Sequence, residues 1–149
     1  MTVSTQRLLP DLEATESIGR DIAKGLGPGD VVCLWGDLGA GKTALARAIL
    51  RALGHAGEVP SPTFNLVLVY ETPQGPVWHF DLYRLEAPAE ALELGIEDAF
   101  ADGISLIEWP DRLGGLLPPD RLDVRLEIPA DGNGRTIAIE PQGAMAAPC

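Results

Sequence analysis

The octapeptide GDLGAGKT, which runs from Gly36 to Thr43, limits what this chain can fold into more than any other feature. It fits the phosphate-loop (P-loop) pattern of Gly, four residues, Gly, Lys, and then Ser or Thr. The apolar run before it, Asp30 to Trp35, predicts a buried strand, and apolar residues at helical spacing after it predict a helix from Lys42 to about Gly54. The segment therefore has the strand, glycine loop and helix order that the motif requires.

This arrangement has a definite chemistry. Successive backbone N–H groups of the loop and the positive end of the helix dipole surround a phosphate group. Lys42 would reach the β- and γ-phosphate oxygens, and the Thr43 hydroxyl would be one ligand of the bridging magnesium ion. The motif thus predicts a site for a nucleoside triphosphate with Mg²⁺.

Length and composition narrow the class of protein. The 149 residues predict one domain over 1–149, and 46% hydrophobic with 22% charged residues is ordinary for a globular fold. The net charge of -11 disfavours strong direct binding to nucleic acid. Two cysteines exclude a disulfide framework or a Cys-x-x-Cys zinc site. With no long apolar window and no signal-peptide pattern, we expect a cytoplasmic protein without a membrane span.

The other periodic segments predict an α/β fold: a mixed, mostly parallel central sheet flanked by helices, with a C-terminal β-hairpin. Helices are expected over Asp11–Leu26 and Pro88–Leu94, and strands over Phe64–Tyr70, Val77–Leu85, Ile104–Trp109, Leu122–Ile128 and around Ile137–Ile139. The first two of these strands are separated by six residues that include Pro73, Gly75 and Pro76, and so predict a hairpin. Residues 141–149 are expected to form a disordered tail.

Two acids compete as the second magnesium carboxylate. Glu108 ends one apolar strand, and Asp81 ends an aromatic version of the same pattern. Alternation predicts that His79 and Asp81 share the face turned away from the core. A structural or hydrogen-bonding role for His79 is favoured over a transition-metal site, because no third ligand has suitable spacing.

Two further segments allow two interpretations each. Ser61-Pro62-Thr63 is either a rigid turn or a mobile loop whose Thr63 senses the γ-phosphate. The span from Glu86 to Asp111 holds eight acids and no Lys or Arg, with Glu86, Glu90, Glu93 and Glu97 at helix-like spacing. It is either a solvated helix face or a docking surface for a basic partner.

In combination these motifs resemble the bacterial TsaE family, also called YjeE. They appear in order as GDLGAGKT from Gly36, SPTF from Ser61, HFDLYRL from His79, ELGIED from Glu93 and IEW from Ile107. The P-loop alone is shared by many unrelated enzymes, whereas its combination with the other motifs is specific.

The resemblance implies roles for particular residues. It implies nucleotide contacts from the phosphate loop (Gly39, Ala40, Gly41, Lys42, Thr43 and Ala44) and magnesium held by Thr43 and Glu108. Asp81 resembles the family's other essential acid, and Thr63 its switch-like loop, so the expected catalytic set is Lys42, Thr63, Asp81 and Glu108. Leu12, Trp109 and Arg135 match further nucleotide contacts. Ala44 departs from the threonine common there, which matters little if its backbone N–H makes the contact.

The resemblance also implies a function: an ATPase with low intrinsic turnover, needed for threonylcarbamoyladenosine (t6A) modification of tRNA. It would use ATP and Mg²⁺ to drive a cycle in a complex of the TsaB and TsaD proteins, without modifying the tRNA itself. Two alternatives are a P-loop small-molecule kinase and a nucleotide switch with negligible turnover. Few arginines are near the expected site, which disfavours the kinase because kinases cover the phosphates with an arginine-bearing lid.

Overall fold

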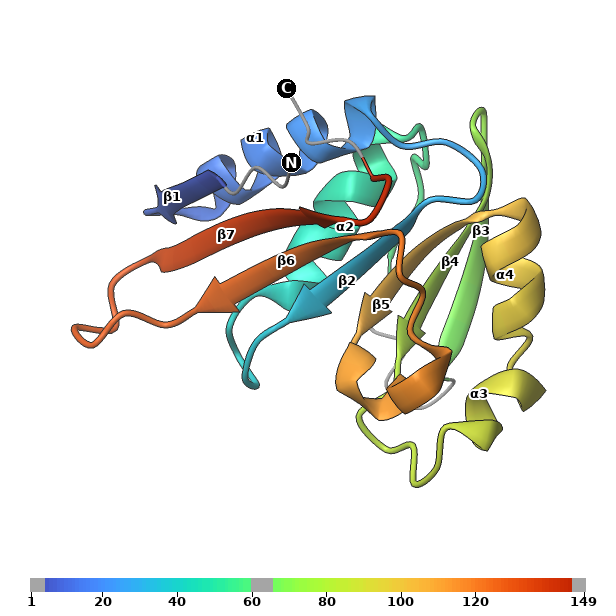
Figure 1. The fold of residues 1–149 in the computed structure, drawn as a ribbon. Coiled ribbons are helices and arrows are strands. Elements are labelled where there is room, and N and C mark those ends of the chain that lie inside the picture. Colours follow the sequence, from blue (N-terminus) through green and yellow to red (C-terminus); the bar gives the residue numbers. More distant parts are fainter. Residues whose placement is uncertain (1–4, 60–65, 146–149) are drawn as a thin grey trace.

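A computed structural model describes residues 5–59 and 66–145 as a seven-stranded sheet with helices on both faces (Figure 1). The strands are β1 (Thr5–Leu9), β2 (Val31–Trp35), β3 (Val67–Thr72), β4 (Gly75–Asp81), β5 (Ile104–Glu108), β6 (Arg121–Glu127) and β7 (Arg135–Gln142). The helices are α1 (Leu12–Lys24), α2 (Lys42–Ala52), α3 (Ala89–Glu93), α4 (Ile96–Asp102) and the 3-10 segment η1 (Pro110–Leu116).

The sheet order is β1-β7-β6-β2-β5-β4-β3. Its centre is parallel, because β2 pairs in parallel with β6 and β5, and β5 pairs in parallel with β4. The outer strands are antiparallel, with β7 on β6, β1 on β7 and β3 on β4. The mixed α/β fold, the β3–β4 hairpin and the C-terminal β6–β7 hairpin are therefore confirmed.

Strand alternation divides the core into two layers. Val32 and Leu34 of β2 pack on the side of α1 and α2, together with Ile22 and Ile49. Cys33 faces the other way, into the cluster that contains Ile96 of α4. Figure 1 shows α1 and α2 on one side of the sheet and α3 and α4 on the other. Because both faces of the central strands are covered, these strands are apolar over nearly their whole length.

The C-terminal region differs from the expected tail. Strand β7 continues through Pro141 and Gln142, and Pro141 lies opposite Leu122 of β6. Met145 packs against the larger core cluster. The expectation of a disordered tail is thus wrong for residues 141–145, because the sheet register extends past the proline. Residues 146–149 lie outside the described part of the chain.

Three described elements have no counterpart in the sequence expectations: β1, α4 and η1. The four glutamates at helix-like spacing do not share one helix, since Gly95 separates α3 from α4. In the two described ranges, no helix has both the length and the apolar character needed to cross a membrane.

Candidate nucleotide site

The P-loop connects the end of β2 to the start of α2, as the motif predicts. Gly39 and Gly41 have φ values of 81° and 105°, a left-handed conformation that side chains disfavour. Gly41 is the N-cap of α2, and no side chain in the described ranges caps the first N–H groups of the helix. These N–H groups, which belong to residues from Lys42 onward, are therefore available to an anion.

Lys42 turns back into the loop. Its side chain is 5% exposed, its ammonium donates a hydrogen bond to the Gly36 carbonyl, and Nζ lies 3.4 Å from the centroid of the Trp109 ring. Burial lowers the pKa of Lys42, while the nearby carboxylates, Glu108 first and then Asp81, oppose this shift. The ammonium is thus held at the loop, partly desolvated and close to the position expected for the phosphates.

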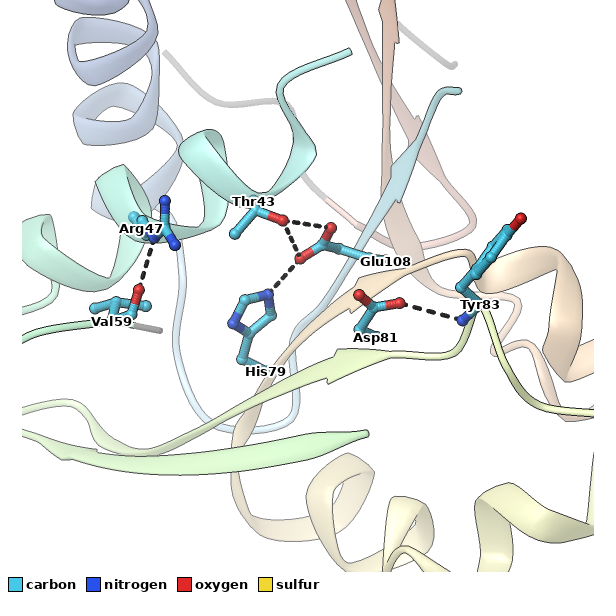
Figure 2. A network of polar contacts seen from close by, with 7 residues as sticks. All are labelled: Thr43, Arg47, Val59, His79, Asp81, Tyr83 and Glu108. Carbon is cyan, nitrogen blue, oxygen red and sulfur yellow. Dashed lines mark hydrogen bonds and ion pairs between the residues drawn. The ribbon is translucent and has the colours of Figure 1, made fainter. Parts of the chain in front are cut away.

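Glu108, the last residue of β5, is contacted by one side chain from α2 and one from β4 (Figure 2). The Thr43 hydroxyl of α2 lies 2.9 Å from Oε1 and 3.1 Å from Oε2 of Glu108. The His79 ring of β4 donates through Nε2 to Oε2 at 2.7 Å. Glu108 is only 2% exposed, so its carboxylate is surrounded by these partners rather than by water. The structure therefore brings together the two residues predicted to hold magnesium.

The donor set fits a hard cation. A threonine hydroxyl and a buried carboxylate are oxygen ligands of the kind that Mg²⁺ takes, with phosphate oxygens and water completing its shell. In the described residues no three His, Cys, Asp or Glu side chains are placed to hold one ion by themselves. Thr43 and Glu108 thus offer two oxygen ligands for such an ion.

Asp81 lies beside Glu108, its direct partner in the parallel β4–β5 register. Its Oδ1 accepts a hydrogen bond from the Tyr83 N–H at 3.2 Å, and its side chain is 7% exposed. The expected orientation of His79 and Asp81 away from the core is wrong, since His79 is fully buried. The reason is that this face of β4 belongs to the same layer as α2, so the polar pair lies beneath the P-loop helix.

Trp109 and Arg135 also lie at the loop. Trp109 follows β5 with a positive φ of 60°, and its ring lies 4.8 Å from that of Tyr83. Arg135, the first residue of β7, donates from Nη2 to the Gly39 carbonyl at 3.0 Å. Leu12 begins α1 with a 62% exposed side chain, three residues after Leu9, which pairs with Arg135.

Thr63 lies outside the described residues, and its role remains a prediction. Next to that segment, Arg47 of α2 donates to the Val59 carbonyl at 2.6 Å (Figure 2). The P-loop helix is thus tied to the chain just before the SPTF motif.

A cavity of about 550 Å³ adjoins the P-loop at Gly36, Asp37 and Ala40. Its wall includes Trp35 of β2 and Arg125 of β6, whose guanidinium lies 4.8 Å from the Trp35 ring centroid. Sequence reasoning did not find this pair, because only the β2–β6 register brings the two residues together. No motif signals it.

Comparison with known proteins identifies one family that this chain matches. The family model described as "Threonylcarbamoyl adenosine biosynthesis protein TsaE" matches residues 9–137. A protein from Rickettsia felis named "tRNA threonylcarbamoyladenosine biosynthesis protein TsaE" is 41% identical over 133 residues, which cover 89% of this chain and 77% of that protein. A protein of the same name from Bacillus subtilis is 37% identical over 120 residues, covering 80% and 75% of the two chains.

Among solved structures, a crystal structure of YdiB from Bacillus subtilis superposes with a TM-score of 0.79 at 30% sequence identity. The match covers 96% of this chain and 88% of YdiB. The fold is therefore shared with YdiB, and the similarity to these relatives extends over most of the chain.

Proposed function

The chain belongs to the TsaE family, and from this premise we propose that it is a magnesium-dependent ATPase of tRNA threonylcarbamoyladenosine biosynthesis. The observation that carries the proposal is the contact of Thr43 with Glu108 at 2.9 Å, directly beside the buried Lys42 ammonium. A hydroxyl, a carboxylate and an ammonium at the N-terminus of a helix are the groups that a P-loop ATPase uses.

The residues divide the work of binding and hydrolysis. The N–H groups at the start of α2 and the Lys42 ammonium bind phosphate oxygens and offset their negative charge. Thr43 and Glu108 would hold Mg²⁺, which supplies charge neutralisation at the phosphates when bound. Asp81, the register partner of Glu108 on the neighbouring strand, would orient a water molecule or a magnesium-bound water. Arg135 at the start of β7 and Trp109 directly after β5 contact the loop from opposite sides of β2.

The test is phosphate release from ATP by the purified chain with no acceptor present, in Mg²⁺ and in EDTA. We expect slow phosphate release that requires Mg²⁺. Nucleotide should bind even though turnover is slow. Conversion of ATP to ADP only after addition of a small-molecule acceptor, with the phosphoryl group on the acceptor and no free phosphate, would favour a kinase. Tight binding with no release, even with partner proteins present, would favour a nucleotide switch.

We further propose that the partners are TsaB and TsaD proteins and that the exposed acids of α3 and α4 contribute to docking. Glu93 and Glu97 are exposed, whereas Glu90 is half-buried and accepts a hydrogen bond from the Glu86 N–H at 3.0 Å. A chain with a net charge of -11 leaves the binding of tRNA to its partners.

The docking test uses Glu97→Lys, with Glu13→Lys as its matched control. Both acids lie in the first turn of a helix and are exposed, but α1 packs on the opposite face of the sheet from α4. We expect only Glu97→Lys to weaken binding to a TsaB–TsaD complex and to flatten its salt dependence. Equal binding by both variants and the parent at low and high salt would leave the acids as a solvated surface.

A further inference from the structure

We infer that His79 is a positioning residue that fixes the Glu108 carboxylate for magnesium. The inference rests on the proposed function, and it concerns a residue that belongs neither to the P-loop motif nor to the pair of acids. His79 is fully buried in β4, and its Nε2 lies 2.7 Å from Oε2 of Glu108. A carboxylate is an acceptor only, so Nε2 carries the proton of this hydrogen bond.

The second ring nitrogen shows that packing does not account for His79. Nδ1 is buried and has no hydrogen-bond partner in the described part of the chain. Its cross-strand neighbours are Leu68 of β3 and Leu106 of β5, so an apolar residue would suit this position better. Burial of the unpaired Nδ1 costs free energy, and the hydrogen bond from Nε2 to Glu108 is the contact that offsets this cost.

Glu108 needs such a partner. The last torsion of a glutamate side chain is broad, so the plane of its carboxylate is set by its hydrogen bonds. Thr43 has one proton to donate and lies within reach of both oxygens. The His79 N–H binds Oε2 specifically and thereby selects one orientation. Partners of this kind typically change metal affinity by about 10- to 100-fold when they are removed.

The experiment compares His79→Met with His79→Gln. Methionine fills the space without a donor, whereas the glutamine amide nitrogen lies as many bonds from Cβ as Nε2 does. ADP binding is measured by calorimetry at a series of Mg²⁺ concentrations and in EDTA, and folding is checked by thermal melting. We expect His79→Met to raise the half-saturating Mg²⁺ concentration about 10-fold or more. His79→Gln should stay within about threefold of the parent, and ADP affinity in EDTA should be unchanged in both.

Ser105→Ala is the control, since Ser105 is a fully buried polar residue of β5 whose Oγ has no hydrogen-bond partner among residues 5–59 and 66–145. If His79→Met does not fold, His79→Asn replaces it, because its amide ends at the position of Nδ1. The inference is overturned if the donor-free variant keeps the parent's Mg²⁺ requirement, or if His79→Gln loses as much as His79→Met. A parent chain that binds ADP without any response to Mg²⁺ overturns the proposed function as well.

Discussion

Replacement of Lys42 by methionine separates binding from stability. In the folded chain the ammonium is 5% exposed, bonded to the Gly36 carbonyl and stacked on Trp109. The burial that lowers its pKa also costs folding free energy, because the charged form is disfavoured there. A methionine needs no such desolvation and still packs against the indole ring.

The two effects differ in size. A hydrogen bond from a charged donor contributes about 1.5–3 kcal/mol and a desolvated cation–π contact about 2 kcal/mol, while burying an ammonium costs several kcal/mol. These terms oppose each other, so we expect Lys42→Met to change the free energy of unfolding by no more than about 2 kcal/mol. Loss of the charge contact with phosphate should cost about 2–5 kcal/mol in binding, which is about 30- to 4000-fold in Kd.

The assay is ATP-analogue binding by calorimetry in Mg²⁺, together with thermal melting, across a range of alkaline pH. The pKa of Lys42 lies below its ordinary 10.5 in the folded chain, so the unfolded chain binds more protons between the two values. The stability contribution of Lys42 therefore rises with pH in that window, while nucleotide affinity falls as the lysine loses its proton. Lys42→Arg, which stays charged, should lose this fall in affinity.

One result would refute the reasoning on Lys42: a Lys42→Met variant that binds the analogue within about threefold of the parent. A second would be a large loss of stability with binding intact, because the side chain would then be structural. A parent affinity that stays constant up to the ordinary lysine pKa would contradict the inferred burial of the charge in the unliganded loop.

Carboxylate, packing and ion-pair variants give three separate expectations. Asp81→Asn and Glu108→Gln should each lower ATP turnover by about 100-fold or more. Only Glu108→Gln should strongly raise the Mg²⁺ requirement, because Glu108 contacts the P-loop threonine directly. Normal phosphate release by either variant would show that its acid has no role in hydrolysis. A Cβ at Gly19 of α1 would lie 2.6 Å from that of Ala48 of α2, so Gly19→Ala should lower the free energy of unfolding in urea by about 1–2 kcal/mol. Adding Ala48→Gly to that variant should restore part of the loss. If the losses of the two substitutions simply add, the two helices are not in this close contact. Asp123→Ala should cost about 3–5 kcal/mol, because the buried carboxylate accepts from an indole N–H and a guanidinium that would both lose their acceptor; a shift in the urea midpoint corresponding to less than 1 kcal/mol would contradict a tightly held pair.

The local order around the P-loop could be predicted from the sequence because its signals are short-range. A buried strand, glycines and a helix with an apolar face follow one another without a break, and β2 and α2 form as expected. Strand β1 had no such signal, since TQRLL is short and pairs with β7 from the far end of the chain. Helix α4 was not predicted as a separate helix, because the helix-like spacing of the glutamates continues across Gly95.

The candidate site was predictable as a set of residues but not as a geometry. The strand pattern places each acid at the end of an apolar strand and so leaves Asp81 and Glu108 equivalent, and only the family resemblance favoured Glu108 as the metal ligand. The order of the strands distinguishes them, because β5 lies between β4 and β2 and so brings Glu108, rather than Asp81, against Thr43. That order depends on contacts between segments far apart in the chain.

His79 shows why alternation separated the two faces of β4 correctly but predicted the wrong exposure for one of them. In a strand with one face in water, a polar residue opposite Phe80 is expected to be solvated. Strand β4 instead lies inside a sheet with helices on both sides, so both faces are covered near its carboxyl end. A polar residue there is costly wherever it points, and it persists when another group requires it. In a strand that is covered on both faces, a buried histidine two residues before an acid is therefore itself an indication of a site, and here the other group is Glu108.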